Sequence, residues 1–485
     1  MKKVLTIIIA ASLALVLLTG CGLAPAASAD TTSAASSGTA TVLTASGSAS
    51  ATGTVLSETD ISVSKRDASG EYDADQAVTL SPGDDLTIRS AGVYILSGVY
   101  EDQMIVIEAG EEDKVQLVLE NATLINENGP AIYVRSADKV FLTAAEGTGN
   151  TISDGSDYTL TDGDTTLDAA VFSKEDLTIN GAGQLTINGN CKHAVVSKDD
   201  LVVTAKNLTV NAENVGLNGK DSVTLSEAAV SITAGSDGIR SENGSDEDKG
   251  YVAVVSSTVT IVSGKDGIQA ETLFTAENAA IAITSGGGSS ARSSDASASS
   301  KGIKAGVSVT ISGGVCQIDA LDDAIHTNGS IVISEGDFTI QSRDDGIHAN
   351  EKVEISGGTL NITAYEGIEA TYILISGGDI TISASDDGIN AARKSAGYTP
   401  TVEITGGTVS ITMGAGDTDG IDSNGDIIIT AGTIRITGNS SFDYDGTATF
   451  TGGTVYVNGQ QVTTLPNQMM GGGMGGFGGG PGRRH

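Results

Sequence analysis

The sequence predicts an all-β fold, a three-sided parallel β-helix that forms a solenoid with about 22 residues per coil. The main observation is a recurring turn, Asp-Gly-Ile or a close variant of it, in the second half of the chain. Its isoleucines are Ile239, Ile268, Ile303, Ile325, Ile347, Ile368, Ile389 and Ile421. From Ile303 the steps are 22, 22, 21 and 21 residues. A fixed period of this length, joined to strand-like segments, is typical of a solenoid in which each repeat is one coil.

A second observation is the pattern inside one coil. Residues 347–349, 353–355 and 359–362 alternate apolar and polar side chains and are rich in β-branched types, as in strands with one buried face. Gly357-Gly358 and Asp386-Asp387 are expected to supply positive φ angles at the corners. No helical pattern separates the strands, which excludes a leucine-rich repeat, and the Gly-Gly-x-Gly-x-Asp repeat of calcium rolls is absent.

The same period continues toward the N-terminus. Residues 170–177 match residues 194–201, and residues 216–221 follow at a similar distance. We therefore expect one repetitive domain over residues 59–465. Three longer spacings contain polar stretches at residues 241–250, 286–300 and 391–400, which are predicted to be surface loops.

The two ends of the chain have different compositions. Residues 1–20 predict a lipoprotein signal peptide, with Lys2 and Lys3 before an apolar run, and Leu18-Thr19-Gly20-Cys21 looks like a bacterial lipobox. That resemblance implies cleavage before Cys21, lipid on its sulfur and a place on the extracellular face of the cell membrane. The alternative is an ordinary signal peptide with a chance cysteine. Residues 21–58 predict a flexible Ala/Ser/Thr/Gly-rich linker, and residues 466–485 a disordered Gly/Met-rich tail.

The net charge limits the molecules that the protein could bind. The chain has 26 basic and 61 acidic residues, a formal charge of −35, which excludes nucleic acid and anionic lipid as partners. The only contact expected with the membrane is the lipid anchor, and we expect a monomer.

Cys191 and Cys316 lie about six coils apart, too far to form a disulfide in a straight solenoid, and both are expected to be buried.

The acidic position of the turn forms a column when the coils stack. Two explanations of this column compete. The first is that Asp precedes Gly because Asp-Gly forms turns well. The second explanation is that Ca²⁺ lies between the coils, because clustered carboxylates are its preferred ligands. The doubled Asp-Asp in three coils favours calcium, since a turn needs only one aspartate. The candidate metal ligands are Asp322, Asp323, Asp344, Asp345, Glu366, Asp386, Asp387 and Asp419.

A second row of side chains directly follows the isoleucines. These positions should face outward, and they are polar throughout the repeat. The candidate substrate-binding residues are Lys304, His326, His348, Glu369 and Asn390. The alternative is an ordinary solvated face. Trp is absent and Tyr is sparse, so a ligand would be held by polar groups, and an acidic polymer would need bridging cations.

Several segments resemble a known family. They are residues 91–98, 113–119, 129–134, 137–140 and 172–181. They are similar to the entry segment and first coils of a bacterial family of cellulose- and acid-sugar-binding parallel β-helix proteins, carbohydrate-binding domain-containing proteins that resemble pectate lyases in fold. The resemblance covers about residues 58–460. It implies a right-handed β-helix that contains calcium, lies at the cell surface and binds plant-type polysaccharides such as polygalacturonate without cleaving them.

Two other functions compete with binding. A calcium-dependent pectate-type lyase would need a basic side chain near the metal. The candidates for that base are Lys301, Lys304, Arg343 and Arg393. The third possibility is a structural or adhesive spacer. Polysaccharide binding by a cell-surface lipoprotein is the favoured prediction, and no catalytic residue is assigned.

Overall fold

The computed structural model describes residues 63–84, 86–163, 165–292, 299–415 and 418–467. The predicted signal peptide, the whole linker with Cys21, and the tail from residue 468 onward lie outside these ranges. Among the described residues, no helix has both the length and the apolar character needed to cross a membrane.

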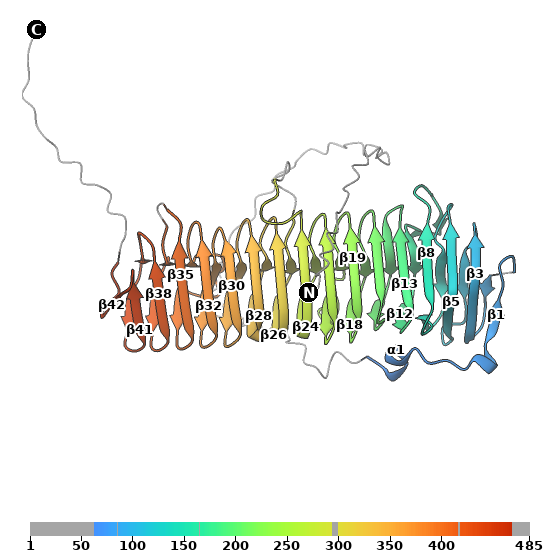
Figure 1. Ribbon diagram of the computed structural model, residues 1–485, viewed down its shortest axis with the longest axis horizontal. Helices are drawn as coiled ribbons and strands as arrows, with labels where there is room; N and C mark the ends of the chain where they lie inside the picture. The colour runs from blue at the N-terminus through green and yellow to red at the C-terminus, as the bar shows by residue number, and fades with distance from the viewer. Residues whose placement is uncertain (1–62, 85, 164, 293–298, 416–417, 468–485) are drawn as a thin grey trace, which may run out of the picture. The chain divides into compact units, whose positions relative to one another are not determined.

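The chain runs repeatedly around one apolar core, and each passage, here called a circuit, adds strands to three columns (Figure 1). The first column contains β2 (Thr87–Ile88), β4 (Ile105–Glu108), β6 (Ile132–Ser136), β11 (Ala169–Ser173), β14 (His193–Ser197), β17 (Leu217–Gly219), β20 (Ile239–Ser241), β23 (Ile268–Ala270), β25 (Ile303–Ala305), β27 (Ile325–Thr327), β33 (Ile389–Ala391), β36 (Ile421–Ser423) and β39 (Phe442–Tyr444). Its strands from β20 to β36 directly follow the turns of the Asp-Gly-Ile motif, which are acidic except before β25.

The second column contains β1 (Val78–Leu80), β7 (Lys139–Ala144), β12 (Asp176–Gly181), β15 (Asp200–Val203), β18 (Ser222–Ser226), β21 (Tyr251–Val255), β34 (Thr401–Ile404), β37 (Asp426–Ile429) and β40 (Ala448–Phe450). The third, drawn as the front row of arrows in Figure 1, contains β8 (Gly149–Asp154), β13 (Gln184–Gly189), β16 (Leu208–Ala212), β19 (Ala229–Ala234), β22 (Thr258–Ser263), β30 (Thr359–Ala364), β32 (Asp379–Ala384), β35 (Thr408–Met413), β38 (Thr433–Thr437) and β41 (Thr454–Val457).

Seven longer strands belong to two columns at once. The second and third columns share β3 (Gly92–Glu101), β5 (Lys114–Asn126), β24 (Leu273–Ser285), β26 (Ser308–Ala320) and β28 (Ser330–Ser342), and the first and second share β29 (Ile347–Ile355) and β31 (Ile368–Ile375). The remaining elements are the antiparallel β42 (Gln460–Val462) on β41, a small hairpin of β9 (Thr161–Asp162) and β10 (Thr165–Thr166), helix α1 (Lys65–Ser69) and a 3₁₀ turn at Ala74–Gln76.

Equivalent residues of successive circuits are hydrogen-bonded neighbours. Ile347 pairs in parallel with Ile325 on one side and Ile368 on the other. All three side chains are completely buried, as are the other isoleucines of the turn motif. The apolar faces of the three columns therefore form one continuous core.

The predicted fold class, a right-handed three-sided parallel β-helix of about 22 residues per coil, is corrected here. The all-β class holds, but 40 strands, all parallel except for β42 on β41, form a single sheet that closes around the core instead of three separate sides. The single sheet results from the corners, where the chain passes from one column to the next. In β26, bulges around Ser312 let the backbone continue its hydrogen bonding from one column into the next. The repeat is also irregular, with motif isoleucines 21 to 35 residues apart.

The corner residues differ from expectation. Gly358 has a positive φ of +87°, as predicted, but Gly357, Asp386 and Asp387 do not have positive φ angles. Gly346, in the acidic turn, has no positive φ; a Cβ there would lie 2.4 Å from Ile362 Cγ2 and 2.6 Å from the Gly367 carbonyl oxygen. Glycine in the Asp-Gly-Ile motif therefore provides space between circuits rather than backbone freedom.

Candidate functional site

The acidic column joins successive circuits through backbone hydrogen bonds. The Asp345 N–H donates to Asp323 Oδ1 at 3.2 Å, and the Asp419 N–H donates to Asp387 Oδ1 at 2.8 Å. Each acceptor thus binds the amide of the equivalent residue one circuit later. This contact gives these aspartates a structural role, in addition to their preference for turns.

Lys301 replaces the acid of its own circuit and neutralises the next. Its Nζ lies 2.9 Å from Asp322 Oδ2 and 2.7 Å from Asp323 Oδ2. Burial lowers the pKa of Lys301, but the charge of Asp323 and the hydrogen bonds to both aspartates outweigh it, and the net pKa lies above its usual value. Lys301 is therefore a cation at neutral pH, which disfavours it as the base of a lyase.

The other candidate bases are placed differently. Lys304 Nζ lies 3.4 Å from Asp266 Oδ2, in the column itself. Arg343 is exposed and donates to the carbonyl oxygen of Ala291 at 3.2 Å. Arg393 is exposed on the loop after β33.

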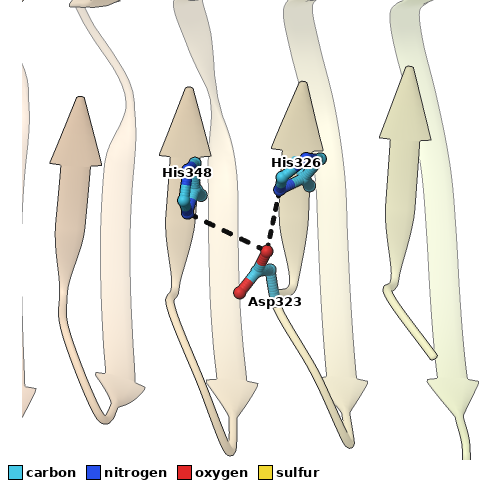
Figure 2. A group of neighbouring side chains, drawn as sticks. All are labelled: Asp323, His326 and His348. Carbon is cyan, nitrogen blue, oxygen red and sulfur yellow. Dashed lines mark hydrogen bonds and ion pairs between the residues drawn. The ribbon is translucent and has the colours of Figure 1, made fainter. Parts of the chain in front are cut away.

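Two predicted substrate-binding histidines lie beside Asp323 (Figure 2). His326 Nδ1 is 2.8 Å and His348 Nδ1 is 4.0 Å from Asp323 Oδ2, and the centroids of the two rings are 4.8 Å apart. Burial raises the pKa of Asp323. The hydrogen bond with His326 and the charge of Lys301 lower it by more than burial raises it, so that the net pKa is far below its usual range. Asp323 is thus a buried, ionised carboxylate.

His348 also contacts two more carboxylates. Its Nδ1 lies 2.7 Å from Asp345 Oδ2 and 3.3 Å from Glu369 Oε2. Burial lowers the pKa of His348, whereas the hydrogen bond to Asp345 and the nearby negative charges raise it to a net value above the usual one. Burial, with the charges of Asp323 and Glu369, raises the pKa of Asp345 to about 7.

Beyond Glu369, the described residues of the column offer oxygen ligands and no imidazole. Asn390 lies between Glu369 and Asp422 in the paired strands and donates through Nδ2 to Glu366 Oε2 at 3.0 Å. Its buried Oδ1 has no hydrogen-bond partner within the described part of the chain. Burial and the charges of neighbouring carboxylates raise the pKa of Glu366 to about 8, and burial with the charge of Asp387 raises that of Asp422 to about 7.

The predicted row of outward side chains is only partly accessible. Glu369 and Asn390 are 5% and 9% exposed, so these two point into the column and not toward solvent. Lys394, from the loop after β33, contacts Glu369 Oε1 at 2.8 Å. Lys304, His326 and His348 are half-buried. The sequence pattern identified the row but could not show that a distant loop residue contacts it.

A surface depression of about 390 Å³ lies next to the column, at the ends of β28, β30, β32 and β35. Arg343 and Tyr365 line it, and Tyr365 is 45% exposed. Arg343 precedes Asp344, and Tyr365 precedes Glu366, so both belong to acidic turns. The sequence pattern did not indicate this depression.

The donors divide into sets suited to different cations. Calcium takes six to eight oxygen ligands. The oxygen-only segment around Asn390 fits calcium, because it contains a buried carbonyl oxygen without a partner beside several carboxylates. Asp322, Asp323 and Asp344 also form an oxygen-only group, but Lys301 occupies two of these carboxylates. The groups around His326 and His348 include imidazole and fit calcium poorly.

A family model described as "Carbohydrate-binding domain-containing protein" matches residues 82–346 and 330–463, most of the chain. The chain belongs to this family. Another carbohydrate-binding domain-containing protein, from Acetivibrio thermocellus, is 34% identical over 129 residues, which is 26% of this chain and 45% of the relative. The chain thus spans less than half the length of that relative.

One solved structure is similar to part of this family member. It is the polysaccharide lyase-like protein from C. thermocellum, as a gadolinium derivative, with 31% sequence identity and a TM-score of 0.40. The similarity covers 44% of this chain and 91% of that chain.

Proposed function

We propose that this carbohydrate-binding domain-containing protein binds an acid-sugar polysaccharide of the polygalacturonate type at the cell surface and does not cleave it. Membership in a carbohydrate-binding family supports a saccharide ligand. The cationic state of Lys301 favours binding over lyase chemistry. A neutral, cellulose-type glycan is the second candidate, since the depression also contains an aromatic ring.

The observation that carries the proposal is that Arg343 and Tyr365 line the same depression beside the acidic column. A guanidinium group binds a carboxylate through two parallel hydrogen bonds. An exposed tyrosine ring offers an apolar face and a hydroxyl to a sugar. Together they suit a chain of uronate residues better than a neutral glucan.

Calcium is part of this proposal. Glu366, Asp387, Asn390 and Asp422 would hold it, because they supply oxygen ligands from neighbouring circuits. When bound, calcium would supply positive charge between the protein's carboxylates and those of the polymer. Without such a cation, the acidic surface would repel an acidic ligand.

The location is also proposed. The lipobox-like sequence ending at Cys21 supports a lipoprotein on the extracellular face of the membrane. The Ala/Ser/Thr/Gly-rich linker would then separate the β domain from the lipid.

Binding is tested by incubating the protein with polygalacturonate or with cellulose, each with calcium and with chelator. Retention on the polymer and the ultraviolet absorbance of an unsaturated product are both recorded. We expect calcium-dependent retention on polygalacturonate, no product, and at least tenfold weaker retention of Arg343→Gln. The exposed Arg393→Gln, on a separate loop, is the control and should bind normally.

Product formation would show a lyase and refute the proposal. Retention on cellulose alone would refute the acid-sugar ligand, and retention on neither polymer would favour a spacer. Equal binding of the Arg343→Gln and wild-type proteins would exclude the depression as the site.

A further inference from the structure

The acidic column contains a second donor set, distinct from the proposed calcium ligands, that includes an imidazole. We infer that Asp345, His348 and Glu369 bind a transition-metal dication of the zinc class. This inference does not depend on the proposed polysaccharide binding, since it rests on the contacts of these three side chains alone.

The three donors come together from two successive circuits. Asp345 lies in the turn before β29, His348 follows on β29, and Glu369 is the direct partner of His348 on β31. Their donor atoms lie within 4.8 Å of one another. The 3.3 Å from His348 Nδ1 to Glu369 Oε2 matches the roughly 3.3 Å that separates ligand atoms around a tetrahedral zinc ion. The 2.7 Å to Asp345 Oδ2 is a hydrogen-bond distance, which would lengthen when a metal replaces the proton.

A single imidazole nitrogen faces carboxylates on several sides. His348 Nδ1 can carry only one proton, which it can share fully with only one of the oxygens of Asp345, Glu369 and Asp323. A metal ion in place of that proton would contact Nδ1, Asp345 Oδ2 and Glu369 Oε2 together. A water molecule or a ligand group could complete four-coordination.

Neighbouring side chains orient these ligands. Lys394 contacts Glu369 through Oε1 and leaves Oε2 directed at His348. Such outer contacts are usual around metal-binding carboxylates. His326 hydrogen-bonds to Asp323 through Nδ1, and its ring lies 4.8 Å from the ring of His348, so it belongs to the surroundings of the site.

Carboxylates outnumber the ammonium groups around His348. Asp323, Asp345 and Glu369 all face its Nδ1, and the described ammonium contacts are those of Lys301 with Asp323 and of Lys394 with Glu369. A bound dication would add positive charge beside Asp345, which contacts the imidazole. An imidazole ligand selects zinc, cobalt, nickel or copper over calcium or magnesium.

The test is a titration of the metal-free full chain with Co²⁺, followed visibly, and with Zn²⁺ by calorimetry. We expect one ion per chain at this site, a Co²⁺ spectrum of low coordination number, and no displacement by millimolar Ca²⁺. Glu369→Gln and His348→Gln should each weaken binding at least tenfold. Glu369→Gln keeps the size of the side chain, so the test remains decisive if the histidine variant does not fold.

Two control variants test whether the other histidines of the chain bind the metal. His193→Gln changes a buried histidine on β14 that also faces a carboxylate, Asp168, at 3.8 Å, and His485→Gln changes the end of the chain; both should bind the metal normally. Equal loss in His193→Gln, no binding of Co²⁺ or Zn²⁺, or displacement by calcium would overturn the inference. Loss in His326→Gln with normal binding by Glu369→Gln would overturn this ligand set. The polysaccharide proposal is tested by retention on polygalacturonate and by Arg343→Gln, neither of which enters this titration, so the two proposals fail separately.

Discussion

At the residue scale, the free energy of the acidic column depends on how each carboxylate is compensated. Asp323 has a lysine and a histidine as partners, whereas Glu366 contacts Asn390 and lies close to other carboxylates. A partnered carboxylate is stabilised in its ionised form and an uncompensated one in its protonated form. Residues of one column therefore respond to pH in opposite directions.

Glu366→Gln should reduce the alkaline loss of stability. The folded pKa of Glu366, about 8, lies above its unfolded value, so its contribution to stability is complete below about pH 4.5 and is lost as pH rises toward 8. With chelator present, the wild type should lose stability between pH 5 and 9 by more than the variant. The difference should be on the order of 1–2 kcal/mol after allowance for solvent screening. Thermal unfolding at both pH values measures it, and parallel curves for the two proteins would contradict it.

Lys301→Met should destabilise the fold at neutral pH. It leaves the buried carboxylate of Asp323 and its neighbour Asp322 without their ammonium partner, at a cost of about 2–4 kcal/mol. Lys304→Met is the matched control. It removes one more exposed lysine with a single 3.4 Å ion pair, and should cost less than about 1 kcal/mol. Urea unfolding compares the two; similar losses would mean that burial of the Lys301 pair has no energetic effect.

At the scale of the element, the short strands of the first column are stabilised by stacked isoleucines. Each strand contributes few hydrogen bonds, and its apolar side chains pack against the same residue type in the circuits before and after. Burial of each such side chain is worth about 1.5–3 kcal/mol. The adjoining glycine keeps the circuits close enough for that contact.

Ile347→Asp should prevent folding, because it places an unpaired charge in the core. Thr381→Asp, at an exposed position of β32, introduces the same charge and should leave stability within about 0.5 kcal/mol of the wild type. Circular dichroism at 25 °C measures both. A folded Ile347→Asp protein with normal stability would show that this side chain does not face the core.

At the scale of the whole molecule, bound calcium should raise the stability of the native state. A ligand that binds only the folded protein stabilises it by about 2.7 kcal/mol at one hundred times its dissociation constant. Chelator should therefore lower the melting temperature, and Ca²⁺ should restore it better than Mg²⁺, which accepts irregular sites poorly. Asp422→Asn and Asn390→Leu should both reduce the calcium effect, whereas Asp379→Asn, at an exposed position of β32, should not. Identical melting curves with calcium and with chelator would contradict the calcium proposal.

The membrane anchor is a separate property of the whole chain. Cys21→Ser removes the sulfur that would carry the lipid. We expect the variant either to appear in the medium or to remain unprocessed, and fractionation with an antibody measures both. A processed Ser variant that stays in the membrane fraction would refute the lipoprotein prediction.

The sequence by itself determined the features that depend on local pattern. The spacing of the isoleucines predicted which side chains are buried and that equivalent residues pair in parallel, because an inward position recurs once per circuit. The same spacing predicted the acidic column and the polar row beside it. Both follow from periodicity, which is present in the chain before any folding.

Only the tertiary structure decided how these rows are connected. The closure of the strands into one sheet depends on backbone hydrogen bonds across the corners, which strand patterns do not reveal. The contact of Lys394 with Glu369 joins residues 25 positions apart through a loop of irregular length. The unpartnered oxygen of Asn390 and the ring nitrogen of His348 among carboxylates likewise depend on side-chain directions set by packing between circuits. Periodicity determines which residues become neighbours, but only the packed structure determines which atoms meet.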